Sequence, residues 1–189
     1  MVQSPIQPTS AEQRFVHAGV TWKGFKTIQT LFESPGVRVV YFQGEVELST
    51  VSELHGIIAG NLGYLLEMYM TELDLDFFGT EDFSIETEAI ASAQADKSYS
   101  FDERKSIPDL AVEIVITGER ETKLKRYAAL GVPEVWFWIE GQLKAYRLDA
   151  GRYTPIQNST WLPKLDLQQL AACAAIELRK EAIKAFVEG

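Results

Sequence analysis

The chain has 189 residues, of which 46% are hydrophobic and 24% charged, a balance that supports a folded protein with a substantial core. Its single cysteine, Cys173, excludes an intrachain disulfide and argues against a thiolate zinc site. No apolar stretch is long enough to span a bilayer, and the N-terminus lacks the basic and apolar regions of a signal peptide, so we expect a cytoplasmic protein without a membrane partner.

The composition shows no break along the chain that would mark a second domain. We therefore expect one domain over residues 1–189. Ser, Pro and Gln are frequent at the start of the sequence, and residues 1–12 are expected to form a loose N-terminal tail. Internal repeats and low-complexity segments are absent from the sequence.

The first predicted elements are a hairpin and a long helix. Apolar residues predict strands over residues 37–42 and 45–48, joined across a turn that contains Gly44. Ser52 is expected to cap an amphipathic helix that ends near Tyr69. His55 lies on the apolar stripe of this helix, so we expect a packed histidine in preference to a metal ligand.

The remaining elements alternate between strands and helices. Strands are predicted near residues 76–78, 83–88, 98–101, 110–117 and 134–139, with a helix around Lys123 before the last of them. A hairpin over residues 142–148 and 152–156 follows, and a single helix over residues 167–187 closes the chain. This order predicts an α/β fold with a mixed central β-sheet flanked by helices and an extra β-hairpin.

Glu113 is the anomalous residue of the predicted strand over residues 110–116, which is otherwise almost wholly apolar and is expected to be buried on both faces. An unpaired carboxylate in such a place costs several kcal/mol or stays protonated. Glu113 should therefore meet a cation, a hydrogen-bond network or a cleft. A divalent metal satisfies this requirement, and a structural ion pair with Lys123 or Arg126 is the alternative.

Two aspartates are candidate partners for Glu113. Asp109 is four positions away on the same strand, which separates the two residues by roughly 13 Å and is too far for one metal. Asp96 precedes the segment 98–101, which can fold back beside the strand of Glu113 as a hairpin, and acids on adjacent strands can share one ion. Asp96 is therefore the better candidate, and a simple turn residue is its alternative interpretation.

Lys123 lies one turn into the helix that follows the strand of Glu113, with the Thr117-Gly118 pair as the expected cap. From there its ammonium can reach back over the strand end, and Tyr127 shares its helix face at i+4. Lys125 and Arg126 belong to the same charged run. A charged run of this kind is usually a solvated face, so that alternative stays open.

A set of segments between about Val37 and Leu170 carries a family resemblance. They are the early hairpin, the helix with His55, ADKSY at 95–99, IPDLAVEIV at 107–115, KLKRY at 123–127, LGVPEVWFW at 130–138 and LPKLDL at 162–167. Together they resemble the PD-(D/E)XK nuclease superfamily, and more closely the Uma-two family of restriction-endonuclease-like proteins. The resemblance implies a restriction-endonuclease-like core.

The same resemblance implies roles for three residues. Asp96 and Glu113 would hold a metal, and Lys123 would be the catalytic lysine. The sequence departs from the superfamily pattern at Ala95, where the name predicts proline, and at Val115, where a lysine is expected two residues after the second acid. Lys123 would therefore supply the lysine function from the helix. The implied cofactor is Mg²⁺, with Mn²⁺ as a substitute.

The implied activity is metal-dependent hydrolysis of phosphodiester bonds in nucleic acid, with DNA favoured. Carboxylate-held Mg²⁺ and a nearby ammonium offset the charge that builds on the phosphate during such a reaction. Two alternatives remain: a catalytically silent relative that serves as a binding or assembly module, and a hydrolase of a small phosphoester or nucleotide.

Charge is the main objection to a nucleic-acid partner. The chain has 18 basic and 27 acidic residues and a net charge of −9, whereas DNA-binding domains are usually basic. From Asp96 to Arg126, however, basic and acidic residues are equal in number. We therefore expect weak, salt-dependent binding of nucleic acid. A homodimer is also expected, since cutting two strands requires two sites or rebinding.

Overall fold

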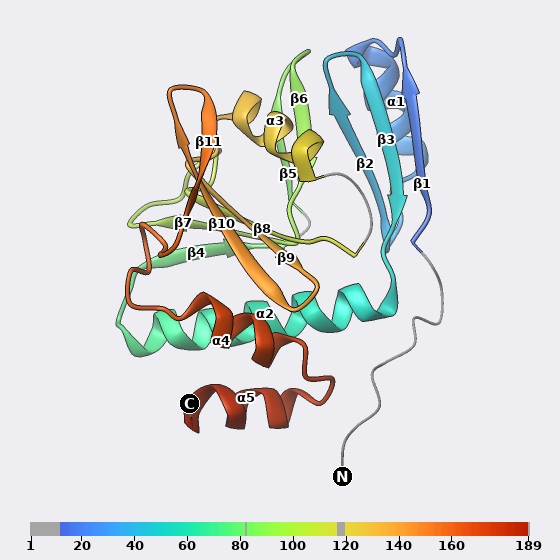
Figure 1. Cartoon of the computed structure of the whole chain (residues 1–189). Coiled ribbons are helices and arrows are strands. Elements are labelled where there is room, and N and C mark those ends of the chain that lie inside the picture. Colours follow the sequence, from blue (N-terminus) through green and yellow to red (C-terminus); the bar gives the residue numbers. More distant parts are fainter. Residues whose placement is uncertain (1–11, 82, 117–119, 189) are drawn as a thin grey trace.

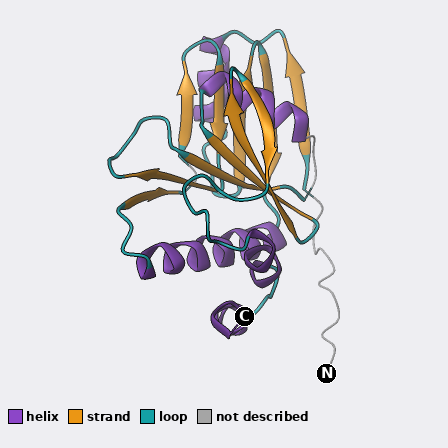
Figure 2. Ribbon diagram, turned by 60° about the vertical axis from the view of Figure 1, so that its left-hand side comes forward, coloured by secondary structure: helices purple, strands orange, loops and turns teal. Residues whose placement is uncertain are grey.

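A computed structural model describes residues 12–81, 83–116 and 120–188, which form two β-sheets and five helices (Figures 1 and 2). The strands are β1 (Arg14–Ala18), β2 (Val37–Phe42), β3 (Glu45–Thr50), β4 (Phe77–Thr80), β5 (Ser84–Thr87), β6 (Ala91–Gln94), β7 (Lys97–Phe101), β8 (Leu110–Ile114), β9 (Glu134–Ile139), β10 (Gln142–Asp149) and β11 (Arg152–Ile156). The helices are α1 (Trp22–Leu31), α2 (Glu53–Glu72), α3 (Arg120–Leu130), α4 (Leu167–Ala174) and α5 (Arg179–Glu188). Nearly all of the expected tail, residues 1–11, and the expected cap at Thr117 or Gly118 lie outside the described residues.

The first sheet has five antiparallel strands in the order β1-β3-β2-β6-β5. Its β2–β3 hairpin is the hairpin expected from the sequence. Helix α1 packs on this sheet through a small aromatic cluster, in which Phe25 lies 4.9 Å from Trp22 and 5.3 Å from Tyr41 between ring centroids. The sheet thus has a local core of its own beside the larger one.

The second sheet has six strands in the order β11-β10-β9-β8-β7-β4. It is mixed, because β8 and β9 are parallel and are connected through α3, whereas the other pairs are antiparallel. Helices α2 and α4 cover one face, and α3 covers the other together with β5 and β6. The mixed sheet, its flanking helices and the extra β10–β11 hairpin confirm the expected fold class.

The strand of Glu113 lies in the centre of this second sheet with all five residues buried. Successive side chains of a strand point to opposite faces. Accordingly Leu110, Val112 and Ile114 belong to the core under α2, whereas Ala111 belongs to the core under α3. Glu113 shares the face of Ala111, and the sheet therefore directs it at α3.

The expected single helix over residues 167–187 is wrong. The chain breaks after Ala174 and turns back, so that α5 packs on α4 and α2 and buries Ala182. A straight helix of that length would extend about 30 Å and carry its second half off the core. Asn61 of α2 stabilises the break, since its Nδ2 donates to the carbonyl of Ile176 at 2.6 Å and its Oδ1 accepts from Arg179 at 3.1 Å.

Three further elements escaped the sequence analysis, namely β1, α1 and β6. Strand β6 is the instructive case, because its small residues are typical of a turn. In the fold it lies between β2 and β5, and Ala91 and Ala93 are buried beneath α3. Small side chains allow the helix to approach the sheet closely, and the partners of β6 come from distant parts of the chain.

A membrane-spanning element is absent from the described part of the chain, where no helix has both the length and the apolar character that a bilayer requires.

Helix α2 packs buried apolar side chains into the core beneath the second sheet. Leu66 is fully buried there, so Leu66→Ala should lower the free energy of unfolding by about 2–5 kcal/mol through lost burial and the cavity left behind. Urea denaturation monitored by circular dichroism measures the change. The control is Leu31→Ala, at an exposed position of α1, which should change stability by less than about 0.5 kcal/mol. Equal effects of both variants would contradict this account of the core.

Candidate functional site

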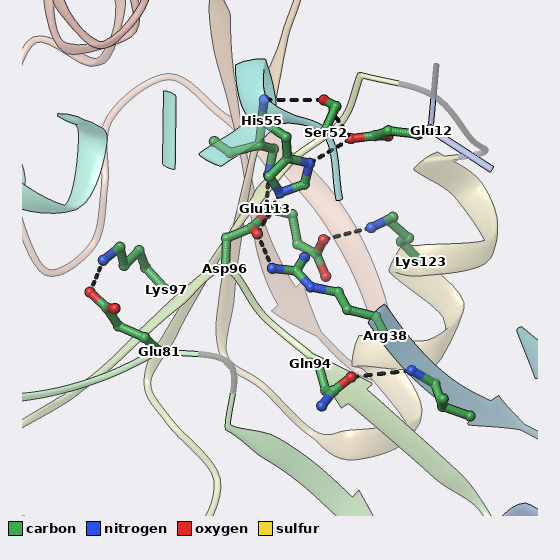
Figure 3. A network of polar contacts seen from close by, with 12 residues as sticks. Glu12, Arg38, Ser52, His55, Glu81, Gln94, Asp96, Lys97, Glu113 and Lys123 are labelled. Atoms are coloured by element: carbon green, nitrogen blue, oxygen red, sulfur yellow. Dashed lines mark hydrogen bonds and ion pairs between the residues drawn. The ribbon is translucent and has the colours of Figure 1, made fainter. Parts of the chain in front are cut away.

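Asp96 lies where the chain leaves β6 of the first sheet and enters β7 of the second. Its carboxylate is almost completely buried. The backbone N–H of Ile114 donates to Oδ2 at 2.6 Å, His55 Nε2 contacts Oδ1 at 2.6 Å, and the Arg38 guanidinium also contacts Oδ1. Figure 3 shows Asp96 within this network. One carboxylate therefore connects β2, α2, β8 and the junction of the two sheets.

The network around Asp96 balances its charges internally. Burial by itself would lower the pKa of His55, but its hydrogen bonds to Asp96 and Glu12 outweigh burial and raise that pKa from 6.5 to about 9. Burial likewise would raise the pKa of Asp96, but the hydrogen bond from His55 and the charge of Arg38 hold it well below its ordinary range. At neutral pH, His55 is thus a cation that donates to Asp96 and, at 2.9 Å, to Glu12.

Glu113 meets two donors from α3. Lys123 Nζ contacts its Oε2 at 2.5 Å, and the Tyr127 hydroxyl donates to its Oε1 at 2.6 Å. Burial, followed by the charge of Glu113, raises the pKa of Tyr127 well above its ordinary value. The charge of Asp96 acts on Tyr127 in the same direction, which puts both acids within electrostatic reach of one hydroxyl. Of the partners that the sequence analysis expected for Glu113, the structure thus has a cation, Lys123, and a hydrogen-bond donor, Tyr127.

The contact between Lys123 and Glu113 is also the structural ion pair that the sequence analysis named as the alternative to a metal site. Arg126, the other residue considered for it, instead donates to Glu47 at 3.0 Å. Asp109 accepts from the Phe101 N–H at 2.9 Å and from Lys105 Nζ at 2.7 Å. Those contacts connect Asp109 to the β7–β8 hairpin.

The chemistry of the two acids fits a divalent cation. Mg²⁺ takes oxygen ligands and is commonly held by one or two carboxylates, with water and phosphate oxygens completing its shell. A carboxylate oxygen has two acceptor positions. Both acceptor positions of Asp96 Oδ1 are occupied, one by His55 and one by Arg38. Asp96 Oδ2 and the two oxygens of Glu113 each accept the one contact described above. Among the described residues no group of three or more acidic, histidine or cysteine side chains gathers as a larger metal cage.

Two hollows flank the network. A pocket of about 960 Å³ lies on the side of Asp96 and extends to α1, β5 and the loop before β5. A smaller polar hollow of about 40 Å³ lies on the side of Lys123. Arg38 and His55 line both of them. Val51 also lines both, so the large pocket, which Asp96 lines, adjoins the small one, which Lys123 lines.

Sequence reasoning missed the two side chains that hold Asp96. Arg38 is a charged residue inside the apolar strand β2, which is the same signal that singled out Glu113. Glu47 binds Arg126 and Arg14, but its strand, β3, alternates polar and apolar residues and offers no such signal. His55, expected to be a packed histidine, is buried as expected but contacts Asp96, for which its helix position alone offers no signal.

The His55 network predicts a pH-dependent contribution to stability. Because the folded pKa of about 9 lies above the unfolded value of 6.5, the contribution is complete below about pH 6.5 and is lost as the pH rises through 9. His55→Gln should therefore cost on the order of 3 kcal/mol more at pH 6 than at pH 10. Urea denaturation of both proteins at the two pH values measures this difference.

The control for this experiment is His17→Gln, at an exposed position of β1, which should change stability by less than about 0.5 kcal/mol. An equal cost of His55→Gln at pH 6 and pH 10 would show that His55 is not held as a cation between the two carboxylates.

The comparison with protein families identifies the chain. A family model described as "Uma2: Putative restriction endonuclease" matches residues 22–178. This span includes Asp96, Glu113 and Lys123, and it contains the strands from β2 to β11. No curated protein matches the sequence. Because the match covers most of the chain and the structure has the mixed α/β architecture described above, the chain belongs to the Uma2 family and has a restriction-endonuclease-like fold.

Proposed function

We propose that this protein is a Mg²⁺-dependent endonuclease that hydrolyses phosphodiester bonds of nucleic acid, with DNA as the favoured substrate. The observation that carries the proposal is the 2.5 Å contact between Lys123 and Glu113, which joins the buried acid of the central strand to the lysine of the following helix. Membership of the Uma2 family supports the same reaction class.

In this proposal Asp96 and Glu113 hold the metal. Both are buried carboxylates, and the donors around Asp96 keep it ionised at neutral pH. When bound, a divalent cation there supplies charge relief on the scissile phosphate and on the leaving oxygen. Mn²⁺, which accepts the same oxygen ligands, should substitute for Mg²⁺.

Lys123 and Tyr127 are the groups of α3 that act beside these acids. The side chain of Lys123 keeps 19% of its surface exposed, so its ammonium can turn from Glu113 to an incoming phosphate. There it would offset the negative charge of the transition state. Tyr127 is completely buried and keeps its proton, and its hydrogen bond fixes the orientation of the Glu113 carboxylate.

A catalytically silent binding or assembly module is the second candidate. The specific observation in its favour is that the carboxylates of both acids already have partners within the protein, including a cation each. A silent relative would keep these ion pairs for stability and would bind no metal. Metal titration by calorimetry separates the two candidates, since the nuclease should bind Mn²⁺ and lose that binding in Glu113→Gln.

A homodimer is a further part of the proposal. Strand β1 forms an edge of the first sheet, all five of its residues are exposed, and Phe15 keeps 61% of its surface accessible. An open strand edge readily accepts a second strand. This edge is where a second copy of the chain would add.

Cleavage of plasmid DNA, single-stranded DNA and RNA at low salt tests the nuclease proposal. The wild type should cleave nucleic acid in Mg²⁺ or Mn²⁺ and stop in excess chelator. Glu113→Gln and Lys123→Met should each lower the rate about a hundred-fold or more, because each removes a charge at the reacting phosphate. Gel analysis of the products measures the rates.

Matched controls are Glu181→Gln on α5 and Lys144→Met on β10, both at exposed positions. They should cleave at the wild-type rate. Two outcomes would contradict the proposal. One is cleavage by Glu113→Gln at the wild-type rate, and the other is a wild-type protein that cleaves none of the substrates with either metal.

A further inference from the structure

We propose that the 960 Å³ pocket beside Asp96 binds single-stranded nucleic acid, with bases against Phe32 and Phe83 and a phosphate at Lys97. This inference rests on the proposed function, because it names the substrate class of the same site. Of the proposed metal ligands, Asp96 lines the pocket, so a strand bound there would lie against that carboxylate. The volume lies at the upper end of the range for ligand sites and is sufficient for a few nucleotides.

Two exposed aromatic side chains line this pocket. Phe32, at the end of α1, keeps 47% of its surface exposed, and Phe83, before β5, keeps 52%. They come from separate segments of the chain that both border the same pocket. Proteins that bind single strands use exposed aromatics as stacking surfaces, since every unpaired base presents an accessible π-face. In a duplex the bases are stacked on each other and unavailable to such side chains.

The charges of the pocket also favour a single strand over a duplex. Cations line it, but each has an acidic partner within it: Lys26 contacts Glu86 at 3.0 Å, and Lys97 contacts Glu81. Arg38 and His55 share Asp96, and Glu33 is a further acid of the lining. A duplex carries two phosphate chains and is held mainly by uncompensated lysine and arginine side chains. A nearly neutral pocket with aromatic surfaces suits a single strand, for which stacking supplies much of the affinity.

Lys97 is the pocket cation best placed to contact a phosphate. Its stem lies over α2 at Gly63, where an added Cβ would clash with Lys97 Cε. Only 9% of the Lys97 side chain is exposed, whereas 67% of the side chain of Glu81, its partner, is exposed. A phosphate can therefore replace the exposed partner of an ammonium whose stem is buried, and Glu81 can turn to water.

Fluorescence anisotropy tests the inference with a labelled 12-nucleotide dT strand and a 12-base-pair duplex, in EDTA so that no cleavage occurs. The single strand should bind at least tenfold more tightly than the duplex. Phe83→Ala and Phe32→Ala should each weaken this binding by roughly 5- to 100-fold. Lys97→Gln should lower the slope of log K against log salt by about 0.7, as expected for one lost phosphate contact.

Phe78→Ala is the matched control, since Phe78 is 46% exposed on β4 and does not line the pocket. It should bind like the wild type. Thermal denaturation confirms that each variant is folded. Gly63→Ala provides a second test of Lys97, because the added methyl group displaces the Lys97 stem without removing its charge, and it should weaken binding in the same direction as Lys97→Gln.

The outcomes separate this inference from the proposed function. Single-strand binding that depends on Phe83, without cleavage in Mg²⁺, would support the inference and overturn the nuclease proposal. The inference alone would be overturned by a different pair of results. Cleavage would require Glu113, but the duplex would bind as tightly as the single strand or more tightly, and Phe32→Ala and Phe83→Ala would leave this binding unchanged. Absence of binding to either oligonucleotide would overturn the inference as well.

Discussion

The buried carboxylate of Asp96 sets the strongest constraint on this structure. A carboxylate removed from water needs donors, and here they come from the β8 backbone, from His55 on α2 and from Arg38 on β2. Since these donors belong to different elements, the five-stranded sheet, the six-stranded sheet and α2 must keep one relative position. Removal of one partner from such a group typically costs several kcal/mol. The position of the pocket and the direction of Glu113 toward α3 depend on the same arrangement.

In the proposed function, the contacts that satisfy the two acids also prepare them for chemistry. Arg38 and His55 keep Asp96 ionised, and Tyr127 orients Glu113 while Lys123 balances its charge. Charged groups of this kind are a costly way to stabilise a core, since well-packed apolar residues of similar volume often serve as well. Their concentration at the junction of the two sheets is therefore more typical of a functional site than of a purely structural one. The proposed metal would relieve the same charges that these cations now balance.

Elements with a strong local pattern were predicted well from the sequence. The hairpin of β2 and β3, the long α2 with its Ser52 cap, the buried β8 and the aromatic β9 all carry a periodicity or a cap that acts within a few residues. The failures have the opposite character. Strand β6 consists of small residues and forms because β2 and β5 pair with it, and the break between α4 and α5 exists because Asn61 of α2 binds its backbone. Neither cause lies near the affected segment in the sequence.

The sequence by itself determined that Glu113 is a charge inside a buried strand, that Lys123 lies one turn into the next helix, and that Asp96 precedes the adjacent strand. These conclusions follow from strand and helix periodicity, which operate over short distances along the chain. Only the tertiary structure decided what surrounds Asp96, since Arg38 and His55 are 58 and 41 residues away from it. It also decided that Lys123, and not Arg126, pairs with Glu113, and that a pocket opens beside Asp96. Contacts between distant residues depend on how whole elements pack, and no local pattern encodes that packing.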